Sequence, residues 1–427
     1  MQSVKHTIKT LKNGLRILMI PQAEAATITV LVLSGTGSLA ERDREQGLSH
    51  FLEHMVFKGT SRYQTPRAIA EAFERIGAIS NAFTDRDYTG YYAKGSPAHL
   101  GTFVDVLGDI YQHATFPESE LAKEKGVIIE EINMYNDMAQ HRAGEMLMQL
   151  MFGDQPAGRS IGGTKEHVSS FTRDDCLTYR AANYHAANTV VVLTGAFDMK
   201  TAYKEVVRVF DKMNSAPIVR RKKTTTSRTT SRAVVLYKAI DQAHLAIGFR
   251  SKPLGHPDAV TLSLLATILG RGMSSRLFQA LREDLGVAYS VVADQDSFSD
   301  HGIFCIMAGV DQTRIDEVVD VISDMLVEIK ETRVSSEELS KAQEFSTGML
   351  RLGLESSDDI ASFYGTQLMV KGVIKTPDAL IKEYMAITPS DILRVARTIF
   401  VQKHARIAVV GPYTDTEARA KTICLRL

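Results

Sequence analysis

Residues 47–60 read Gly47-Leu48-Ser49-His50-Phe51-Leu52-Glu53-His54-Met55-Val56-Phe57-Lys58-Gly59-Thr60. Apolar residues recur here at helical spacing, and Gly59 stands where a helix would end. His50 and His54 are four residues apart, so both imidazoles project from one face of the predicted helix. Two imidazoles at this spacing can bind one zinc ion, and Glu53 lies beside them where a general base is needed. The alternative is that both histidines lie on a helix surface beside a solvated glutamate.

The overall composition is typical of a globular protein and does not favour binding to nucleic acid or to a membrane surface. The chain has 427 residues, which is too long for one ordinary domain and indicates two or more. Hydrophobic residues make up 44%, as in a packed core. The formal net charge is zero and the pI is about 7.2, so no overall basic field favours nucleic acid or a membrane surface. We therefore expect neither as a partner.

Cysteine use and the N-terminal residues indicate the compartment. Cys176, Cys305 and Cys424 lie far apart and form no CxxC pair, which is typical of thiols in a reducing compartment. The first residues lack both an apolar signal segment and the composition of a transit peptide. No apolar stretch approaches the roughly 18 residues of a membrane span. We expect a soluble, cytoplasmic protein.

The two halves of the chain repeat one order of predicted strands and helices. Gly59 corresponds to Gly270, and Gly77 corresponds to Gly286, at nearly equal offsets. The simplest account is an α+β fold of two homologous α/β domains, each a mostly antiparallel sheet with helices packed on one side. The helix at 261–265, which corresponds to the histidine helix, has no ligand residue, so we expect metal in the first domain only.

A change in composition separates the two halves. Residues 217–232 are polar and basic, without apolar periodicity or interleaved aromatics, and this pattern indicates an exposed linker. We therefore predict an N-terminal metal-binding domain at 1–216 and a C-terminal domain at 233–427.

A tetrahedral catalytic zinc needs a third protein ligand besides two histidines. Glu131 lies 77 residues after His54 on a predicted helix that starts at Glu118, and we predict it as this ligand. Glu124 lies two turns earlier on the same face, where it would orient a ligand. The alternative for Glu131 is that it forms an exposed acidic pair with Glu130. The order His-x-x-Glu-His is the reverse of the commoner His-Glu-x-x-His helix of zinc proteases.

Several stretches together resemble one family across essentially the whole chain. HFLEHMVFKGT (50–60) resembles the signature of the inverted-zincin peptidases, the family of pitrilysin, insulin-degrading enzyme and the mitochondrial processing peptidase. Similar family segments are SNAFT (80–84), QPAGRSIGG (155–163) and LREDLGVAY (281–289). The departures are small: Ala139 stands where bacterial relatives often have Pro, and the Gly-rich loop of non-catalytic processing subunits is absent.

The resemblance implies a zinc metalloendopeptidase with one zinc ion per chain. His50, His54 and Glu131 would bind zinc, and Glu53 would be the general base. Arg282 and Tyr289 would stabilise the oxyanion; without the resemblance, a helix-surface arginine and a core tyrosine are the alternatives. The substrate strand of the family corresponds to these residues: Asn81, Ala82, Phe83 and Thr84. A peptide would pair with this strand in extended form, with Phe83 lining a side-chain pocket.

The resemblance also implies how the chain assembles. Larger relatives have four such domains that close as a clamshell around peptides or presequence-like segments, whereas this chain has two. Half-length members dimerise, so that Arg282 and Tyr289 of one subunit complete the site of the other. We expect a homodimer, with a heterodimer as the alternative. The alternative function is an inactive or partner-dependent subunit with a structural or substrate-binding role, and the alternative compartment is the mitochondrial matrix.

Overall fold

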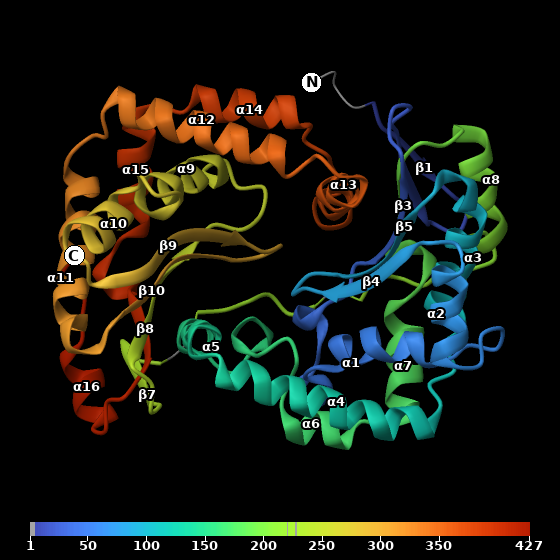
Figure 1. The fold of residues 1–427 in the computed structure, drawn as a ribbon, viewed down its shortest axis with the longest axis horizontal. Helices are drawn as coiled ribbons and strands as arrows, with labels where there is room; N and C mark the ends of the chain where they lie inside the picture. The colour runs from blue at the N-terminus through green and yellow to red at the C-terminus, as the bar shows by residue number, and fades with distance from the viewer. Residues whose placement is uncertain (1–4, 220, 227–228) are drawn as a thin grey trace. The chain divides into compact units, whose positions relative to one another are not determined.

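The computed structural model describes residues 5–219, 221–226 and 229–427. The start of the chain (1–4) and three residues of the predicted linker (Arg220, Ser227 and Arg228) lie outside the described residues. The described chain forms two compact units, unit 1 and unit 2 (Figure 1). Unit 1 combines the chain up to Ile132 with Ser160–Lys222 and Arg351–Pro377. Unit 2 combines Asn133–Arg159, Lys223–Leu350 and Asp378–Leu427.

Unit 1 contains a six-stranded mixed sheet. In spatial order its strands are β1 (Thr7–Thr10), β2 (Arg16–Pro21), β6 (Thr189–Gly195), β3 (Ile28–Ser34), β5 (Thr89–Gly95) and β4 (Ile79–Thr84). β2 runs parallel to β6, and the other neighbours are antiparallel. The central strands β3 and β6 are rich in Val and buried along their whole length, as expected for strands covered on both faces.

Helices from the same half of the chain cover one face of this sheet. The helices of this half within unit 1 are α1 (Leu48–Met55), α2 (Pro66–Glu74), α3 (Leu100–His113), α6 (Lys165–Ser170), α7 (Arg173–Asn183), α8 (Met199–Phe210) and most of α4 (Glu118–Asp137). Alternate residues of β3 (Ile28, Val30 and Val32) share a core with Phe51 of α1 and Phe103 of α3. Because α1 also packs against β4 and α7, its two histidines are held on a rigid element next to β4.

The opposite face of the unit 1 sheet is covered by α13 (Ser357–Lys371), a helix from the C-terminal half. A side chain at Gly365 would meet Val192 Cγ2 at 2.8 Å and Leu33 Cδ1 at 2.9 Å, so the helix backbone lies directly on the sheet. The hydroxyls of Ser357 and Thr29 are hydrogen-bonded at 2.8 Å. α13 therefore completes unit 1 (Figure 1).

Unit 2 repeats the sheet with one strand fewer. Its strands in spatial order are β7 (Ala233–Tyr237), β11 (Arg406–Gly411), β8 (Gln242–Ser251), β10 (Gly302–Asp311) and β9 (Ala288–Ser297). β7 runs parallel to β11, as β2 does to β6 in unit 1, and the other neighbours are antiparallel. The predicted fold class of two homologous α+β domains is confirmed by this shared topology.

The helices of unit 2 again lie on both faces of the sheet. Those from the C-terminal half are α9 (Ala259–Gly270), α10 (Arg276–Phe278) with a π-helical turn (Gln279–Asp284), α11 (Ile315–Glu331), α12 (Ser336–Leu352), α14 (Pro377–Ala386), α15 (Pro389–Ile399) and α16 (Thr416–Thr422). The face opposite α9 is covered by α5 (Ala139–Phe152) from the N-terminal half. A side chain at Gly248 of β8 would meet Met151 Sδ at 2.6 Å and Leu147 at 3.0 Å.

α5 and α13 hold equivalent places in the repeat, because each follows the second of two long helices after its hairpin. Each helix packs on the sheet of the other half, an arrangement that we call the helix exchange. The domain boundaries predicted from the internal repeat, 1–216 and 233–427, stay a prediction. The compact units differ from them at α5 and α13, because these helices bury apolar residues on the other sheet.

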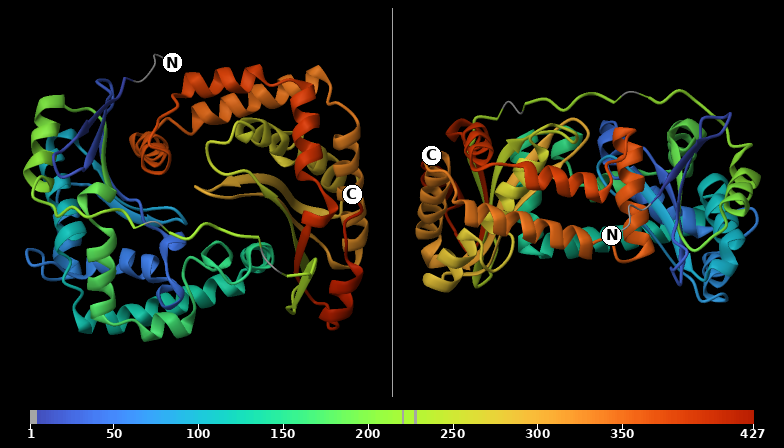
Figure 2. Two further views of the ribbon diagram at one scale, coloured as in Figure 1. Left: turned by 180° about the vertical axis from the view of Figure 1, so that it is seen from behind. Right: turned by 90° about the horizontal axis from the view of Figure 1, so that it is seen from above.

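The described part of the predicted linker has neither helix nor strand. Residues 217–219, 221–226 and 229–232 follow an extended course that is visible from behind and from above (Figure 2). Thr224 is held in unit 2, where its backbone N–H donates to Asp300 Oδ2 at 2.8 Å. None of the helices in the described chain combines the length and the apolar character needed to cross a membrane.

Candidate metal centre and active site

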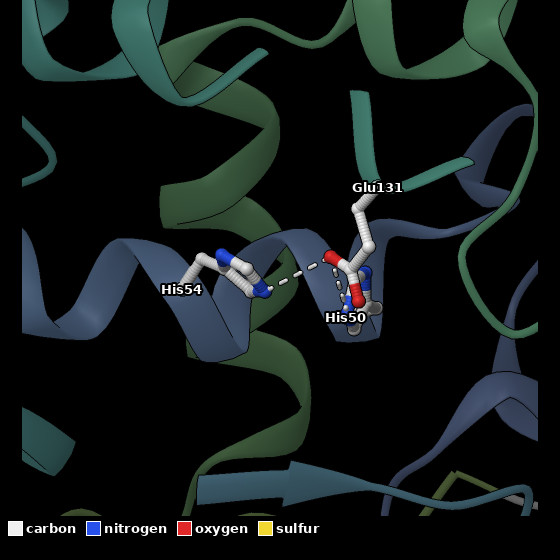
Figure 3. Close-up of side chains that lie close together, drawn as sticks. All are labelled: His50, His54 and Glu131. Carbon is white, nitrogen blue, oxygen red and sulfur yellow. Dashed lines mark ion pairs between the residues drawn. The ribbon is translucent and has the colours of Figure 1, made fainter. Parts of the chain in front are cut away.

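α1 presents both histidines on one side because its other side is buried. Leu48, Phe51, Leu52 and Met55 face the core, which leaves His50 and His54 half-buried at the surface of the helix. Their ring centroids lie 4.7 Å apart with an interplanar angle of 67°. The predicted helical spacing thus brings the two imidazoles together, as Figure 3 shows.

Glu131 reaches the two histidines from α4. Its Oε2 lies 3.6 Å from His50 Nε2 and 3.7 Å from His54 Nε2 (Figure 3). Zinc–ligand bonds of about 2.0–2.1 Å place neighbouring ligand atoms of a tetrahedral site roughly 3.3 Å apart, so these separations fit one ion. Among the residues that the structure describes, this is the one group of three such side chains close enough to share a metal.

Glu124 orients His54 from behind. Its Oε1 is hydrogen-bonded to His54 Nδ1 at 2.8 Å, and its Oε2 pairs with Lys58 Nζ at 2.6 Å. Burial raises the pKa of Glu124, but the bonds to His54 and Lys58 outweigh it and make the net shift downward. In the neutral imidazole of His54, Nδ1–H donates a hydrogen bond to the ionised Glu124, which leaves Nε2 with its lone pair towards Glu131.

His50 differs from His54 in what sets the protonation state of its imidazole. Burial, assisted by the neighbouring His54, lowers the pKa of His50 to about 4. The imidazole is therefore neutral near pH 7, the form that binds a metal. Within the described chain, His50 Nδ1 is buried and has no hydrogen-bond partner, in contrast to His54 Nδ1.

Glu53 lies between the histidines on α1 and is tied to the neighbouring strand. Thr84 Oγ1 of β4 donates to Glu53 Oε2 at 2.5 Å. Burial raises the pKa of Glu53, with Glu131 acting in the same direction and the Thr84 bond opposing it. A carboxylate with a raised pKa beside a metal site has the properties of a general base.

The predicted substrate strand is β4, the last strand of the described sheet in unit 1. Asn81 is exposed, and its Oδ1 accepts a bond from the N–H of Ala82 at 2.9 Å. The Phe83 ring lies over Gly90 of β5, where a Cβ would come within 2.3 Å of it. Phe83 also meets Tyr88 edge-on, with ring centroids 6.1 Å apart. Glycine at position 90 therefore makes room for the ring on the face of the hairpin.

Arg282 and Tyr289 lie together in unit 2, whereas His50, His54 and Glu131 belong to unit 1. Arg282 Nη1 donates to the Tyr289 carbonyl at 2.9 Å, and its guanidinium lies 5.6 Å from the centre of the Tyr289 ring. Tyr289 is 72% exposed, so the alternative of a core tyrosine is wrong. Arg282 belongs to the π-helical turn, a distortion that is frequent at functional sites.

Three contacts of this site were not predicted from the sequence. Lys58 follows His54 by four residues, so helical spacing is the local signal that places it on the same side of the helix. The bond from Thr84 to Glu53 depends on how β4 lies against α1, which no local pattern indicates. The same holds for Glu41, whose buried carboxylate binds the start of α1.

Two family models match the chain in sequence order. "Insulinase (Peptidase family M16)" matches residues 16–165, and "Peptidase M16 inactive domain" matches residues 170–345. The chain belongs to the M16 peptidase family. The resemblance inferred from the motifs is thereby confirmed. The cluster of His50, His54 and Glu131 lies within the first match, and the second match covers Arg282 and Tyr289.

Two bacterial M16 relatives are similar over nearly their full length. "Uncharacterized zinc protease YmxG" of Bacillus subtilis (strain 168) is 36% identical over 406 residues, 94% of this chain and 97% of that protein. "Uncharacterized zinc protease SCO5738" of Streptomyces coelicolor is 30% identical over 415 residues, 96% of this chain and 90% of that protein. Both names support a zinc-dependent peptidase as the general class of this M16 chain.

Solved structures share the M16 fold. A protease from Helicobacter pylori has a TM-score of 0.88 at 23% identity, covering 96% of this chain and 100% of that one. A chain of complex III2 from Candida albicans has a TM-score of 0.84 at 17% identity, covering 98% of this chain and 99% of that one. At these identities the likeness concerns the fold alone.

Proposed function

We propose that the chain is a zinc metalloendopeptidase that cleaves peptides bound in extended form. The observation that carries this proposal is the cluster of His50, His54 and Glu131, with Glu53 next to it on the same helix. Membership of the M16 family and the names of its relatives support the same class. The three ligands would hold one Zn²⁺ per chain, and Glu124 would fix the orientation of His54.

A bound zinc ion would supply Lewis acidity, polarising the peptide carbonyl and lowering the pKa of a coordinated water molecule. Glu53 takes the proton of the attacking water and returns it to the leaving amine. The bond from Thr84 holds Oε2, so we assign the proton transfer to Oε1. The raised pKa of Glu53 suits both directions of transfer, because a group with a pKa shifted towards the operating pH can accept the proton and then return it.

We propose that the substrate adds a strand to β4 along Asn81, Ala82, Phe83 and Thr84. As the last strand of its described sheet, β4 offers backbone groups for pairing, and such pairing accepts many sequences. Phe83, held over Gly90, would line the pocket for one substrate side chain. Peptides and presequence-like segments are the substrate class that this arrangement suits.

Arg282 and Tyr289 are the proposed donors to the oxyanion, as in the family segment that they match. We propose a cytoplasmic homodimer in which these residues of one subunit complete the zinc site of the other. The exposure of Tyr289 supports this role, because a hydroxyl that meets a substrate must be accessible. A heterodimer with a distinct partner is the alternative assembly.

The decisive test is Glu53→Gln, which removes the base and keeps the size of the side chain. We expect peptide hydrolysis to fall by at least about 100-fold, since general bases contribute 10²–10⁴-fold. Zinc content should stay near one ion per chain, because Glu53 is not a ligand. Quenched-peptide hydrolysis and metal analysis of the same samples measure both effects. Glu130→Gln is the matched control, with the same charge change at an exposed position beside Glu131.

The proposal fails if Glu53→Gln retains full, chelator-sensitive activity. It also fails if the zinc-loaded wild type hydrolyses none of a broad peptide panel, alone or with a partner chain. That second outcome would favour the structural or substrate-binding role.

A further inference from the structure

The start of α1 is bound by a carboxylate that belongs neither to the helix nor to the ligand set. Glu41 lies six residues before Gly47 and is only 6% exposed. Its Oε2 accepts the N–H of Gly47 and its Oε1 accepts the N–H of Ser49, both at 2.8 Å. The first N–H groups of a helix have no partner within the helix, so Glu41 acts as a cap supplied from a loop.

The local backbone excludes an ordinary cap at this helix. The N-cap residue is Gly47, with φ at 87°, a conformation that favours glycine. A Cβ at Gly47 would meet the carbonyl oxygen of Gly162 at 2.6 Å, so Ser, Thr or Asp does not fit there. The capping group must therefore come from elsewhere in the chain, and Glu41 provides it.

A second contact fixes the same turn. Ser49 Oγ is hydrogen-bonded to Tyr179 OH of α7 at 2.7 Å, and both groups are buried. Burial raises the pKa of Glu41 to about 8, while the N–H groups of Ser49 and Gly47 oppose this rise. The two N–H donors favour the ionised form of Glu41, whereas its burial favours the protonated form. In either form both oxygens lie on the first turn of α1.

His50 follows Ser49 directly and depends on this turn more than His54 does. His54 has Glu124 to orient its ring, whereas His50 Nδ1 has no partner within the described chain. With no second bond on the ring, the place of His50 Nε2 opposite Glu131 is set by the backbone of the first turn of α1. The element that fixes this backbone is the cap.

We propose that Glu41 is a positioning residue of the metal centre, which fixes the first turn of α1 and thereby places His50 for zinc. This inference rests on the proposed function in taking zinc as the ion. It adds a role to a residue that touches neither metal nor substrate. Residues that orient a ligand typically change metal affinity or activity by 10–100-fold when mutated.

The test compares Glu41→Gln with Glu45→Gln in the full-length protein. Glu45 is the matched control, because it is a carboxylate of the same loop that accepts a backbone N–H, from Arg42 at 2.9 Å. We expect Glu41→Gln to lower the zinc affinity at least about 10-fold, as measured by competition with a chelating dye. Its cobalt(II) absorption spectrum should change, and at saturating zinc kcat should fall with KM unchanged. Glu45→Gln should match the wild type in all three.

Glu41→Asp keeps the carboxyl group with a shorter reach and serves if Glu41→Gln does not fold. It should show a smaller loss of zinc affinity and an altered cobalt spectrum. Wild-type affinity and spectrum in the Glu41 variants, even with a lower melting temperature, would overturn the inference. If the wild type binds zinc and hydrolyses no peptide, the proposed function fails, while the metal measurements still decide the role of Glu41.

Discussion

His50 and His54 lie one turn apart on α1, and their surroundings act on their protonation in opposite directions. Burial and the neighbouring His54 lower the pKa of His50 to about 4. Burial also lowers the pKa of His54, but the Glu124 bond and the carboxylates of Glu53 and Glu131 outweigh it, and the net shift is upward. His50 is therefore kept neutral, whereas His54 attracts a proton, which a metal bound at this ring would have to displace.

The two shifts predict opposite pH dependences of stability for the zinc-free protein. As the pH is lowered from about 6.5 to about 4, His50 becomes protonated in the unfolded chain before it does in the folded one. The free energy of unfolding therefore decreases as the pH is lowered through this window, by on the order of 3 kcal/mol in total. The raised pKa of His54 contributes stability below the unfolded value of 6.5, and this is lost as pH rises through the folded value. Denaturant unfolding of His50→Gln, His54→Gln and wild type across pH 4.5–8 measures both terms.

His50→Gln should remove the loss of stability on the acid side, and His54→Gln should remove the loss on the alkaline side. The two variants are matched controls for each other, since they carry the same substitution on one helix. The same pH slope in both would contradict the assignment.

At this scale the sequence predicted the groups that regular geometry brings together. Helical spacing places His50 and His54 on one face of the first helix. Glu124 and Glu131 share one face of a second predicted helix, and this position identifies them as candidates. Glu41 was not predictable, because its contact with Ser49 depends on the course of a loop and on a glycine φ that no periodic pattern shows.

At the scale of elements, the helix exchange depends on close contact between helix and sheet. In unit 1 the small residue is in the helix, since Gly365 of α13 lies against Leu33 and Val192. In unit 2 it is in the strand, since Gly248 of β8 lies against Met151 of α5. In each contact a glycine lets helix and sheet approach closely at a buried position, where added volume has no space.

Gly365→Ala should therefore destabilise unit 1, although alanine is the better helix former. Its Cβ would lie 2.8 Å from Val192 Cγ2, and overpacking of this kind costs about 1–3 kcal/mol. Gly348→Ala is the matched control, because no atom lies within 4 Å of its Cβ in α12. It should gain up to about 1 kcal/mol from helix propensity alone. Thermal unfolding compares the two variants, and equal stabilisation in both would show that α13 does not pack as described.

The repeat was readable at this scale, but the exchange was not. Alternation and turn residues predicted the strands, and paired glycines related the two halves. The buried residues of α13 recur at helical spacing, but this buried stripe includes Ser357 and Gly365, whereas the apolar Phe363, Met369 and Val370 lie outside it. Its apolar pattern therefore carries little information about its partner. Which of two equivalent sheets a helix covers is decided by packing, which one sequence does not reveal.

At the scale of the whole molecule, the proposed site needs residues from both halves of the repeat. The ligands are in unit 1, and Arg282 and Tyr289 are in unit 2. In the proposed homodimer, each zinc site uses Arg282 and Tyr289 of the partner subunit. Two chains with different defects should then restore one another's activity.

Mixing Glu53→Gln dimers with Tyr289→Phe dimers tests this arrangement. Each variant alone should be at least about 100-fold less active, because one lacks the base and the other an oxyanion donor. After subunit exchange we expect roughly a quarter of wild-type activity, since half of the dimers are mixed and each has one intact site. Light scattering tests whether the chain forms a dimer, and peptide hydrolysis measures the recovery of activity. Exchange without recovery would contradict completion by the partner.

The helix exchange also has a consequence for how the protein is made. During translation the first sheet leaves the ribosome well before α13, and α5 leaves before any strand of the sheet that it covers. The N-terminal half therefore cannot finish folding while the C-terminal half is being synthesised, in contrast to chains whose domains fold one after another. α13 spans Ser357–Lys371 of the 427 residues. The apolar face of β3 and β6 that it covers therefore stays exposed until more than four-fifths of the chain has been synthesised. We expect a nascent chain with such an exposed face to bind chaperones until its last fifth emerges.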